Sequence, residues 1–215
     1  DISFQVEQGE LFGLIGPDGA GKTTLFRILT TLMIADSGSA KVDGYDVKTD
    51  FREIRKRVGY MPGRFSLYPD LTVEENLSFF ATLFNTSIEK FKTRRAGALS
   101  GGMKQKLALS CALIHKPSVL FLDEPTTGVD AVSRREFWDL LYNLQQQKIT
   151  ILVSTPYMDE ASLCDRVALI QEGRILDIDT PEGITHKFNH VLWSARSDNM
   201  YKLLTDLTVQ EEVKS

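Results

Sequence analysis

A glycine-rich segment near the amino end, GPDGAGKTT, carries residue types that bind phosphate groups. It has the spacing G-x-x-x-x-G-K-[ST], follows the apolar run LFGLIG and precedes a helix-like stretch. Glycines let successive backbone N–H groups converge on an anion, and a helix amino terminus adds partial positive charge. We call this segment the phosphate loop and expect all of it to contact a nucleotide: Gly16, Pro17, Asp18, Gly19, Ala20, Gly21, Lys22, Thr23 and Thr24.

Two side chains of the phosphate loop have predicted roles in chemistry. Lys22 is placed to reach the terminal phosphates, and the Thr23 hydroxyl can ligate Mg²⁺. Asp18 and Gly19 are most simply a turn, because a carboxylate aimed at phosphates would be repelled. The alternative is an accidental glycine-rich turn, but the strand before the loop and the helix after it favour phosphate binding.

An acidic pair, Asp123 and Glu124, ends the apolar run VLFLDEP. Adjacent residues of a strand point to opposite sides, so the two carboxylates have separate predicted tasks. Asp123 would complete the Mg²⁺ shell through water, and Glu124 would face the terminal phosphate and polarise an attacking water. The alternative is that the pair only caps the next helix.

Composition bounds the class of protein. Apolar residues make up 42% and charged residues 25%, which is ordinary for a globular domain. The net charge of −4 and the scattered basic residues do not indicate a nucleic-acid partner. Cys111 and Cys164 suggest neither a disulfide framework nor a metal site, and no apolar run approaches the roughly 18 residues that span a bilayer.

Four short apolar runs, at 11–16, 118–123, 149–154 and 166–170, alternate with helical patterns and predict a parallel sheet with crossover helices. The alternating segments ISFQV (2–6) and SAKVDG (39–44) predict a small antiparallel layer. Two capping boxes, Thr72 with Glu75 and Ser133 with Glu136, predict helix starts.

The segment LSGGMKQKLAL (99–109), which we call the signature segment, decides the class. Together with the phosphate loop, VGYMPGRFSLYPDLTVEENL (58–77), the acidic pair and TGVDAVSR (127–134), it gives the chain a resemblance to the ATP-binding subunits of ABC transporters. The resemblance covers essentially the whole sequence. Tract by tract, the chain looks most like the ATPases of bacterial ABC-2 type exporters.

The resemblance implies a fold and a division of the chain. The implied fold is α/β, a P-loop NTPase (RecA-like) parallel sheet core with an antiparallel β subdomain and a short α-helical subdomain. The core with its β layer is expected at 1–62 and 117–180, the helical subdomain at 63–116 and an appendage at 181–215.

The resemblance also implies cofactors, partners and a location. ATP and Mg²⁺ are the implied cofactors. The implied partners are transmembrane permease subunits and a second ATP-binding domain, at the cytoplasmic side of the inner membrane. Ser100, Gly101 and Gly102 would touch the nucleotide of the facing domain, and Asp130 would bridge the interface. From the residues alone, Ser100 is a plausible N-cap of a helix starting near Gly102, and a capped helix with no further role is the alternative.

Three positions depart from the family pattern. Gly63 and Met103 each stand where the family has a glutamine, and Pro156 stands where it has a histidine that contacts the γ-phosphate. We hypothesise that MgATP binds normally but is hydrolysed slowly, or that a second ATPase domain performs the turnover. Locally, Pro156 is expected at the first helical position with Thr155 as N-cap, and Pro62–Gly63 is expected to form a type II turn.

Rival functions are a degenerate ATP-dependent dimerisation module with little turnover and a soluble ABC protein acting on ribosomes or DNA. A GTPase is disfavoured because no Asn-Lys-x-Asp segment occurs. The start at Asp1 suggests a piece of a longer protein, with the adenine-stacking aromatic upstream. Only 22 residues separate Asn76 from Leu99, so we expect natural residues to be absent here and a Cα–Cα step far above about 3.8 Å within 85–92.

Overall fold

The computed structural model describes residues 2–63, 67–83 and 95–187 of the 215-residue chain. The chain divides into two units, Asp1–Thr185 and His186–Ser215. The expected chain step within 85–92 lies outside the described residues, as does most of the expected appendage.

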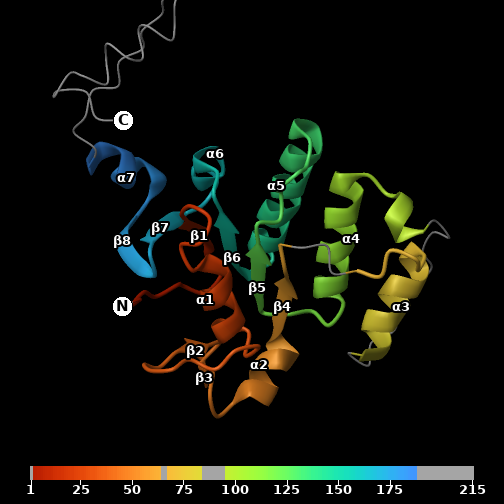
Figure 1. Cartoon of the computed structure of the whole chain (residues 1–215), viewed down its shortest axis with the longest axis horizontal. Helices are drawn as coiled ribbons and strands as arrows, with labels where there is room; N and C mark the ends of the chain where they lie inside the picture. The colour runs from red at the N-terminus through yellow and green to blue at the C-terminus, as the bar shows by residue number, and fades with distance from the viewer. Residues whose placement is uncertain (1, 64–66, 84–94, 188–215) are drawn as a thin grey trace, which may run out of the picture. The chain divides into compact units, whose positions relative to one another are not determined.

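A six-stranded sheet forms the centre of the first unit (Figure 1), in the order β4-β5-β6-β1-β7-β8. The four predicted strands are confirmed as β1 (Leu11–Ile15), β5 (Val119–Asp123), β6 (Thr150–Thr155) and β7 (Arg166–Gln171), all mutually parallel. Parallel neighbours bring their carboxyl ends to one edge, and the phosphate loop and acidic pair follow β1 and β5 there.

Two further strands were not predicted. β4 (Val58–Met61) pairs with β5 in parallel and is a short edge strand containing a glycine, which weakens its pattern. β8 (Arg174–Asp179) pairs antiparallel with β7 across the two-residue loop Glu172–Gly173. Both loop residues have positive φ, 49° and 71°, as a type I′ hairpin turn requires.

Each face of the sheet has its own apolar cluster because successive strand residues point to opposite sides. On one face, Phe12 and Phe121 pack with Phe26 of α1 (Lys22–Leu29) and Ile54 of α2 (Phe51–Arg57). On the other, strand residues pack with α4 (Gly101–Leu113) and α5 (Ala131–Gln146). Figure 1 shows α5, α4 and α3 (Val73–Leu83) in succession, with α4 packed between its two neighbours.

The remaining elements are short. A two-stranded antiparallel sheet joins β2 (Lys41–Val42) and β3 (Tyr45–Asp46), and a 3₁₀ turn, η1, spans Ala96–Ala98. Helices α6 (Met158–Ala161) and α7 (Pro181–Lys187) follow β6 and β8. Across the described ranges, none of the helices has both the length and the apolar character needed to cross a membrane.

The prediction of a strand at ISFQV is wrong, because residues 2–6 join no hydrogen-bonded ladder. Phe4 nevertheless stacks on Phe12, with ring centroids 5.5 Å apart, and Val6 packs against the same cluster. Alternation of polar and apolar residues indicates that one side of an extended segment is buried. It does not supply the neighbouring strand that a ladder requires.

One capping box is confirmed and the other is wrong. The Thr72 N–H donates to Glu75 Oε2 at 2.7 Å, and the Glu75 N–H donates to Thr72 Oγ1 at 3.1 Å. The later helix starts before Ser133: α5 is capped by Asp130, whose Oδ1 accepts the Ser133 N–H at 2.9 Å. Asp130 prevails because the chain is already extended there and Asp is a strong N-cap residue.

Candidate functional site

The phosphate loop turns sharply between β1 and α1. Gly19 and Gly21 have φ of 80° and 103°, in the region that glycine tolerates at little cost. Pro17, Asp18 and Gly19 form its exposed tip, while the Ala20 side chain is buried. No side chain caps α1, so its first backbone N–H groups keep their hydrogen-bonding capacity for an anion.

Close packing explains the glycine at the start of the loop. A Cβ atom at Gly16 would lie 2.1 Å from the backbone oxygen of Ile170 in β7, far inside van der Waals contact. The position therefore excludes every side chain, and the loop lies directly against the sheet edge. This is the close backbone approach for which glycine is selected.

Lys22, the first residue of α1, is buried with 4% of its surface exposed. Its Nζ donates to the backbone oxygens of Gly16 and Pro17, at 2.7 and 3.0 Å, and lies 3.5 Å from Glu124 Oε1. The structure thus brings together the two residues predicted to act in catalysis, from segments about a hundred residues apart. The ammonium is held inside the loop that should bind phosphates.

The acidic pair at the end of β5 is held by a serine that the sequence analysis did not assign. Ser154 of β6 is fully buried, and its Oγ donates to Asp123 Oδ1 at 2.5 Å. The Glu124 N–H donates to Ser154 at both the backbone oxygen, 3.0 Å, and Oγ, 3.1 Å. One residue therefore positions both acids. No local sequence pattern marks this role, because the order of strands in the sheet brings Ser154 beside Asp123.

The predicted magnesium ligands suit a Mg²⁺ ion that also binds substrate phosphates. Asp123 is 3% exposed and Thr23 lies in the first turn of α1. No cluster of three or more His, Cys, Asp or Glu residues that could hold a metal occurs among the described residues. Mg²⁺ commonly takes one or two protein ligands together with phosphates and water, so this small donor set fits it.

The signature segment forms the start of α4. Ser100 caps the helix by accepting the Met103 N–H at Oγ, 3.3 Å, which confirms the predicted N-cap. α4 packs against α3, α5 and β4, whereas α1 packs against β5. Within one chain, the helix that begins in the signature segment and the helix that follows the phosphate loop therefore pack against different elements.

The signature glycines also have a packing reason. A Cβ atom at Gly102 would lie 2.3 Å from the Ser133 Cβ, and one at Gly101 would lie 3.3 Å from the Gly128 backbone oxygen. The start of α4 thus lies directly against the turn that precedes α5 and against its first helical turn. Asp130, predicted at an interface, is exposed within that turn. Hydrogen bonds from Ser133 to its carboxylate lower the Asp130 pKa from its usual value.

The departure at Gly63 lies beside the acidic pair. A Cβ atom there would lie 3.0 Å from the Asp123 backbone oxygen and 3.6 Å from Glu124 Cβ. The prediction of a type II turn is wrong, because Gly63 lacks the positive φ that its second central position requires. A larger residue at 63 would have to displace the backbone of β5 by a few tenths of an ångström.

The departure at Pro156 follows the last residue of β6. The predicted place of Pro156 in a helix is wrong, because α6 begins at Met158. Thr155 is still paired with Ile15 in the sheet, so its backbone is extended. The residues after it must first turn away from the strand before a helix can begin. Thr155 Oγ1 instead accepts the Tyr157 N–H at 3.1 Å, spanning the proline. His115 does not substitute for the missing histidine, since its Nε2 lies 3.1 Å from the backbone oxygen of Val58, at the opposite end of the sheet.

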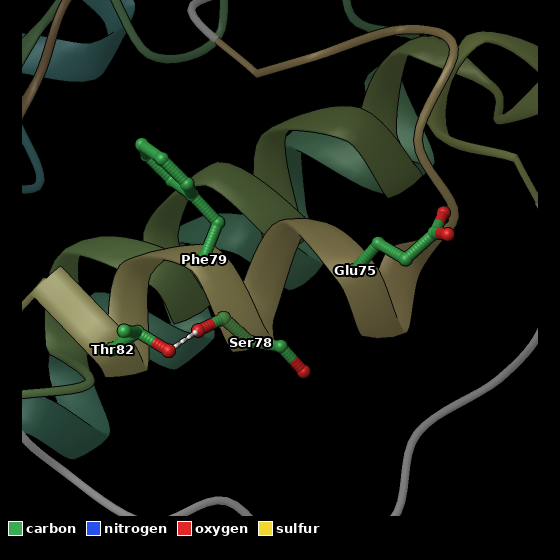
Figure 2. Close-up of a pocket in the computed structure, with 4 residues that line it drawn as sticks. All are labelled: Glu75, Ser78, Phe79 and Thr82. Atoms are coloured by element: carbon green, nitrogen blue, oxygen red, sulfur yellow. Dashed lines mark hydrogen bonds between the residues drawn. The ribbon is translucent and has the colours of Figure 1, made fainter.

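A shallow hollow along α3 is lined by Glu75, Ser78, Phe79 and Thr82 (Figure 2). Its one hydrogen bond between drawn residues joins Thr82 Oγ1 to the Ser78 backbone oxygen at 2.9 Å. None of the predicted site residues lines it, and no group of polar side chains converges there. The residues predicted to bind phosphate lie instead at the carboxyl edge of the sheet.

Comparison with known proteins identifies the family. The family model described as ABC transporter matches residues 1–127, more than half of the chain. The chain belongs to the ABC transporter family. The probable multidrug ABC transporter ATP-binding protein YbhF of Escherichia coli (strain K12) is 40% identical over 199 residues, which cover 85% of this chain and 34% of YbhF.

Two further similarities extend the ABC assignment. The Nod factor export ATP-binding protein I of Burkholderia orbicola (strain AU 1054) is 40% identical over 200 residues, covering 85% of this chain and 66% of that protein. The structure of cbiO1 from Clostridium perfringens, part of the ABC transporter complex cbiONQ, matches with a TM-score of 0.76 at 27% identity, covering 86% of this chain and 83% of that one. The ABC chain described here thus spans about a third to two thirds of these two curated relatives.

Proposed function

We propose that this chain is the ATP-binding domain of an ABC exporter, which binds MgATP, dimerises around it and hydrolyses it to drive transport through separate membrane subunits. The observation that carries the proposal is the meeting of Lys22 and Glu124 at 3.5 Å beside the loop that follows β1. The names of the relatives, a multidrug transporter protein and a Nod factor export protein, support an exporter.

Each residue has a role in the proposal. The backbone N–H groups of the phosphate loop and Lys22 bind the phosphates. Thr23 and Asp123 would hold Mg²⁺, which neutralises phosphate charge when bound. Glu124 orients and polarises the water that attacks the terminal phosphate. Asp123 and Glu124 keep their positions through Ser154.

Dimerisation is proposed from the location of the second anion site. Ser100, Gly101 and Gly102 lie on a helix that packs away from α1 in the same chain. In a facing copy or a second ATP-binding domain, they would cover the nucleotide bound by this chain, with Asp130 at the contact. The division into a core at 1–62 and 117–180, a helical subdomain at 63–116 and an appendage from 181 belongs to the same proposal. So does the peripheral location at the cytoplasmic side of the inner membrane.

Slow hydrolysis is proposed because two polar contacts of the family pattern are absent, at Gly63 and Pro156. Removing one preorganised transition-state contact costs about 3 kcal/mol, or roughly a hundredfold in rate. We expect the purified chain to bind MgATP and to release phosphate slowly. Pro156→His should raise the steady-state rate, and Glu124→Gln should lower it with MgATP binding retained.

Steady-state phosphate release and equilibrium binding of a fluorescent ATP analogue test this proposal. Ordinary turnover in the wild-type chain that Glu124→Gln abolishes would contradict slow hydrolysis. Absence of saturable, Mg²⁺-dependent nucleotide binding would overturn the proposed function as a whole. Binding with negligible turnover in both the wild-type chain and Pro156→His would favour the second candidate, an ATP-dependent dimerisation module.

A further inference from the structure

Glu160 is a buried acid with no part in the proposed nucleotide site. It lies in α6, four residues after Pro156, and only 1% of its surface is exposed. Burying a carboxyl group is costly unless hydrogen bonds and opposite charge compensate for lost hydration. The contacts that provide this compensation show which segments Glu160 joins.

Both carboxyl oxygens of Glu160 are engaged. The Thr126 hydroxyl donates to Oε1, and the Thr155 hydroxyl donates to Oε2 at 2.6 Å. Arg134 Nε lies 3.6 Å from Oε1, an ion-pair distance that is too long for a hydrogen bond. The Arg134 guanidinium is itself held over the Tyr157 ring, 4.9 Å from its centroid.

These contacts tie Glu160 to three places around the proposed site. Thr126 lies two residues after Glu124, Thr155 ends β6, and Arg134 is in the first turns of α5. The segment 124–130, which we call the acidic loop, runs from Glu124 to the helix cap Asp130. Glu160 therefore holds the middle of the acidic loop against the end of β6.

The acidic loop needs contacts that fix its conformation, because the backbone of Glu124 is strained. Its φ of 49° is in the left-handed region, which costs a side-chain-bearing residue free energy unless its surroundings fix it. On one side, Ser154 accepts the Glu124 N–H. On the other, the Thr127 N–H donates to the Glu124 oxygen at 3.3 Å, next to the residue that Glu160 anchors.

We propose that Glu160 is a positioning residue for ATP hydrolysis: through Thr126 it fixes the acidic loop, and thereby the direction in which Glu124 presents its carboxylate. This inference rests on the proposed ATPase function. It assigns the acidic segment after Pro156 a task in the site that does not involve contact with the nucleotide. Glu160 thereby acts on the rate of turnover and leaves nucleotide binding to the phosphate loop.

The first test separates turnover from binding. Glu160→Gln keeps the shape of the side chain but removes its charge, and should lower kcat about tenfold to a hundredfold while nucleotide affinity changes less than about twofold. Asp159→Asn is the matched control: Asp159 also lies 3.6 Å from an Arg134 nitrogen, but its side chain is 73% exposed. It should leave both quantities unchanged. Equal kcat in Glu160→Gln and the wild-type chain would overturn the inference.

A second pair of variants tests the contact itself. Thr126→Val removes the hydroxyl at nearly constant shape, and Thr126→Ser keeps it. Thr126→Val should reproduce the loss of kcat in Glu160→Gln, the double variant should lose no more than either single one, and Thr126→Ser should stay near the wild-type rate. This pair also carries the test if Glu160→Gln does not fold. Equal rates in Thr126→Val and Thr126→Ser would contradict the proposal.

A third measurement is independent of hydrolysis. In the nucleotide-free chain, Glu160→Gln should speed hydrogen exchange of the Glu124 and Val129 amides, which donate to Ser154 and Thr126. Amides of β1 should exchange at the wild-type rate. The inference would be overturned if the amides of β1 exchanged faster to the same extent, or if the Glu124 and Val129 amides exchanged at the wild-type rate. Failure of the wild-type chain to bind or hydrolyse ATP would overturn the proposed function, while this exchange measurement still tests the role of Glu160.

Discussion

Burial decides what individual reactive side chains of this ABC chain can do. Lys22 and Asp123 are both buried, yet Lys22 has two backbone acceptors and Asp123 has the Ser154 hydroxyl. Cys111 and Cys164 are buried without such partners for the thiolate, and desolvation raises the pKa of each thiol to about 12. Lys22 and Asp123 can therefore stay charged and interact with a charged ligand, whereas burial keeps the two thiols neutral.

The first prediction concerns these thiols. Because the thiolate is the reactive form and the native pKa is far above the working pH, neither cysteine should react with an aromatic disulfide reagent at about pH 8 in the folded chain. Both should react after unfolding in guanidinium. Ser110→Cys places a thiol on the exposed neighbour of Cys111 and should react at once. Rapid native reaction of the wild-type chain would contradict this expectation.

Ser154 and Glu160 also show the limit of prediction at the scale of the residue. The phosphate loop and the acidic pair have fixed local spacings, so the sequence alone located Lys22 and Glu124. Ser154 donates a hydrogen bond to Asp123 in the neighbouring strand, and Glu160 accepts one from Thr126, which is 34 residues earlier in the chain. Neither contact has a local pattern, because the sheet order brings these residues together.

At the scale of the element, helix starts are decided by which residue is already extended when the helix begins. Thr72 was correctly predicted as a helix cap, whereas α5 is capped by Asp130 and not by the predicted Ser133. The start of α5 in turn fixes where Ser133 meets α4. Gly102 is required there because its missing side chain leaves room for the Ser133 Cβ.

A stability prediction follows for this helix contact. Gly102→Ala would place a Cβ atom 2.3 Å from that of Ser133, so overpacking should lower the free energy of unfolding. The expected loss is about 1–3 kcal/mol in urea denaturation. Gly101→Ala is the control, since its Cβ would meet only the Gly128 oxygen at 3.3 Å and should cost less. Ser133→Gly should recover part of the loss, and a Gly102→Ala chain as stable as the wild type would contradict the predicted clash.

At the scale of the whole molecule, the phosphate loop and the signature segment lie beside helices that pack in different apolar clusters, α1 on one face of the sheet and α4 on the other. The proposed closure of the nucleotide by the signature segment would therefore require a second copy or a related domain. The chain covers 34% of the YbhF sequence and 66% of the Nod factor protein, so the relatives carry further sequence beyond the part that matches.

Self-association provides the whole-molecule prediction. With hydrolysis blocked by Glu124→Gln, MgATP should double the mass of the chain in light scattering, because nucleotide joins two surfaces. Lys22→Ala or Ser100→Arg should prevent this. An equal mixture of the chains carrying those two changes should recover part of it, since one composite site remains intact. A chain that stays monomeric with bound MgATP would contradict self-dimerisation.

The sequence by itself determined the parallel strands β1, β5, β6 and β7, the phosphate loop, the acidic pair and the caps at Thr72 and Ser100. These features depend on spacing within a few residues, where chain geometry leaves little freedom. Tertiary structure decided that residues 2–6 form no strand, that Pro156 precedes α6, that Asp130 caps α5, that Ser154 hydrogen-bonds Asp123 and Glu124, and that Glu160 accepts a hydrogen bond from Thr126. Those outcomes depend on which strands lie side by side and on which polar groups must be satisfied once water is excluded.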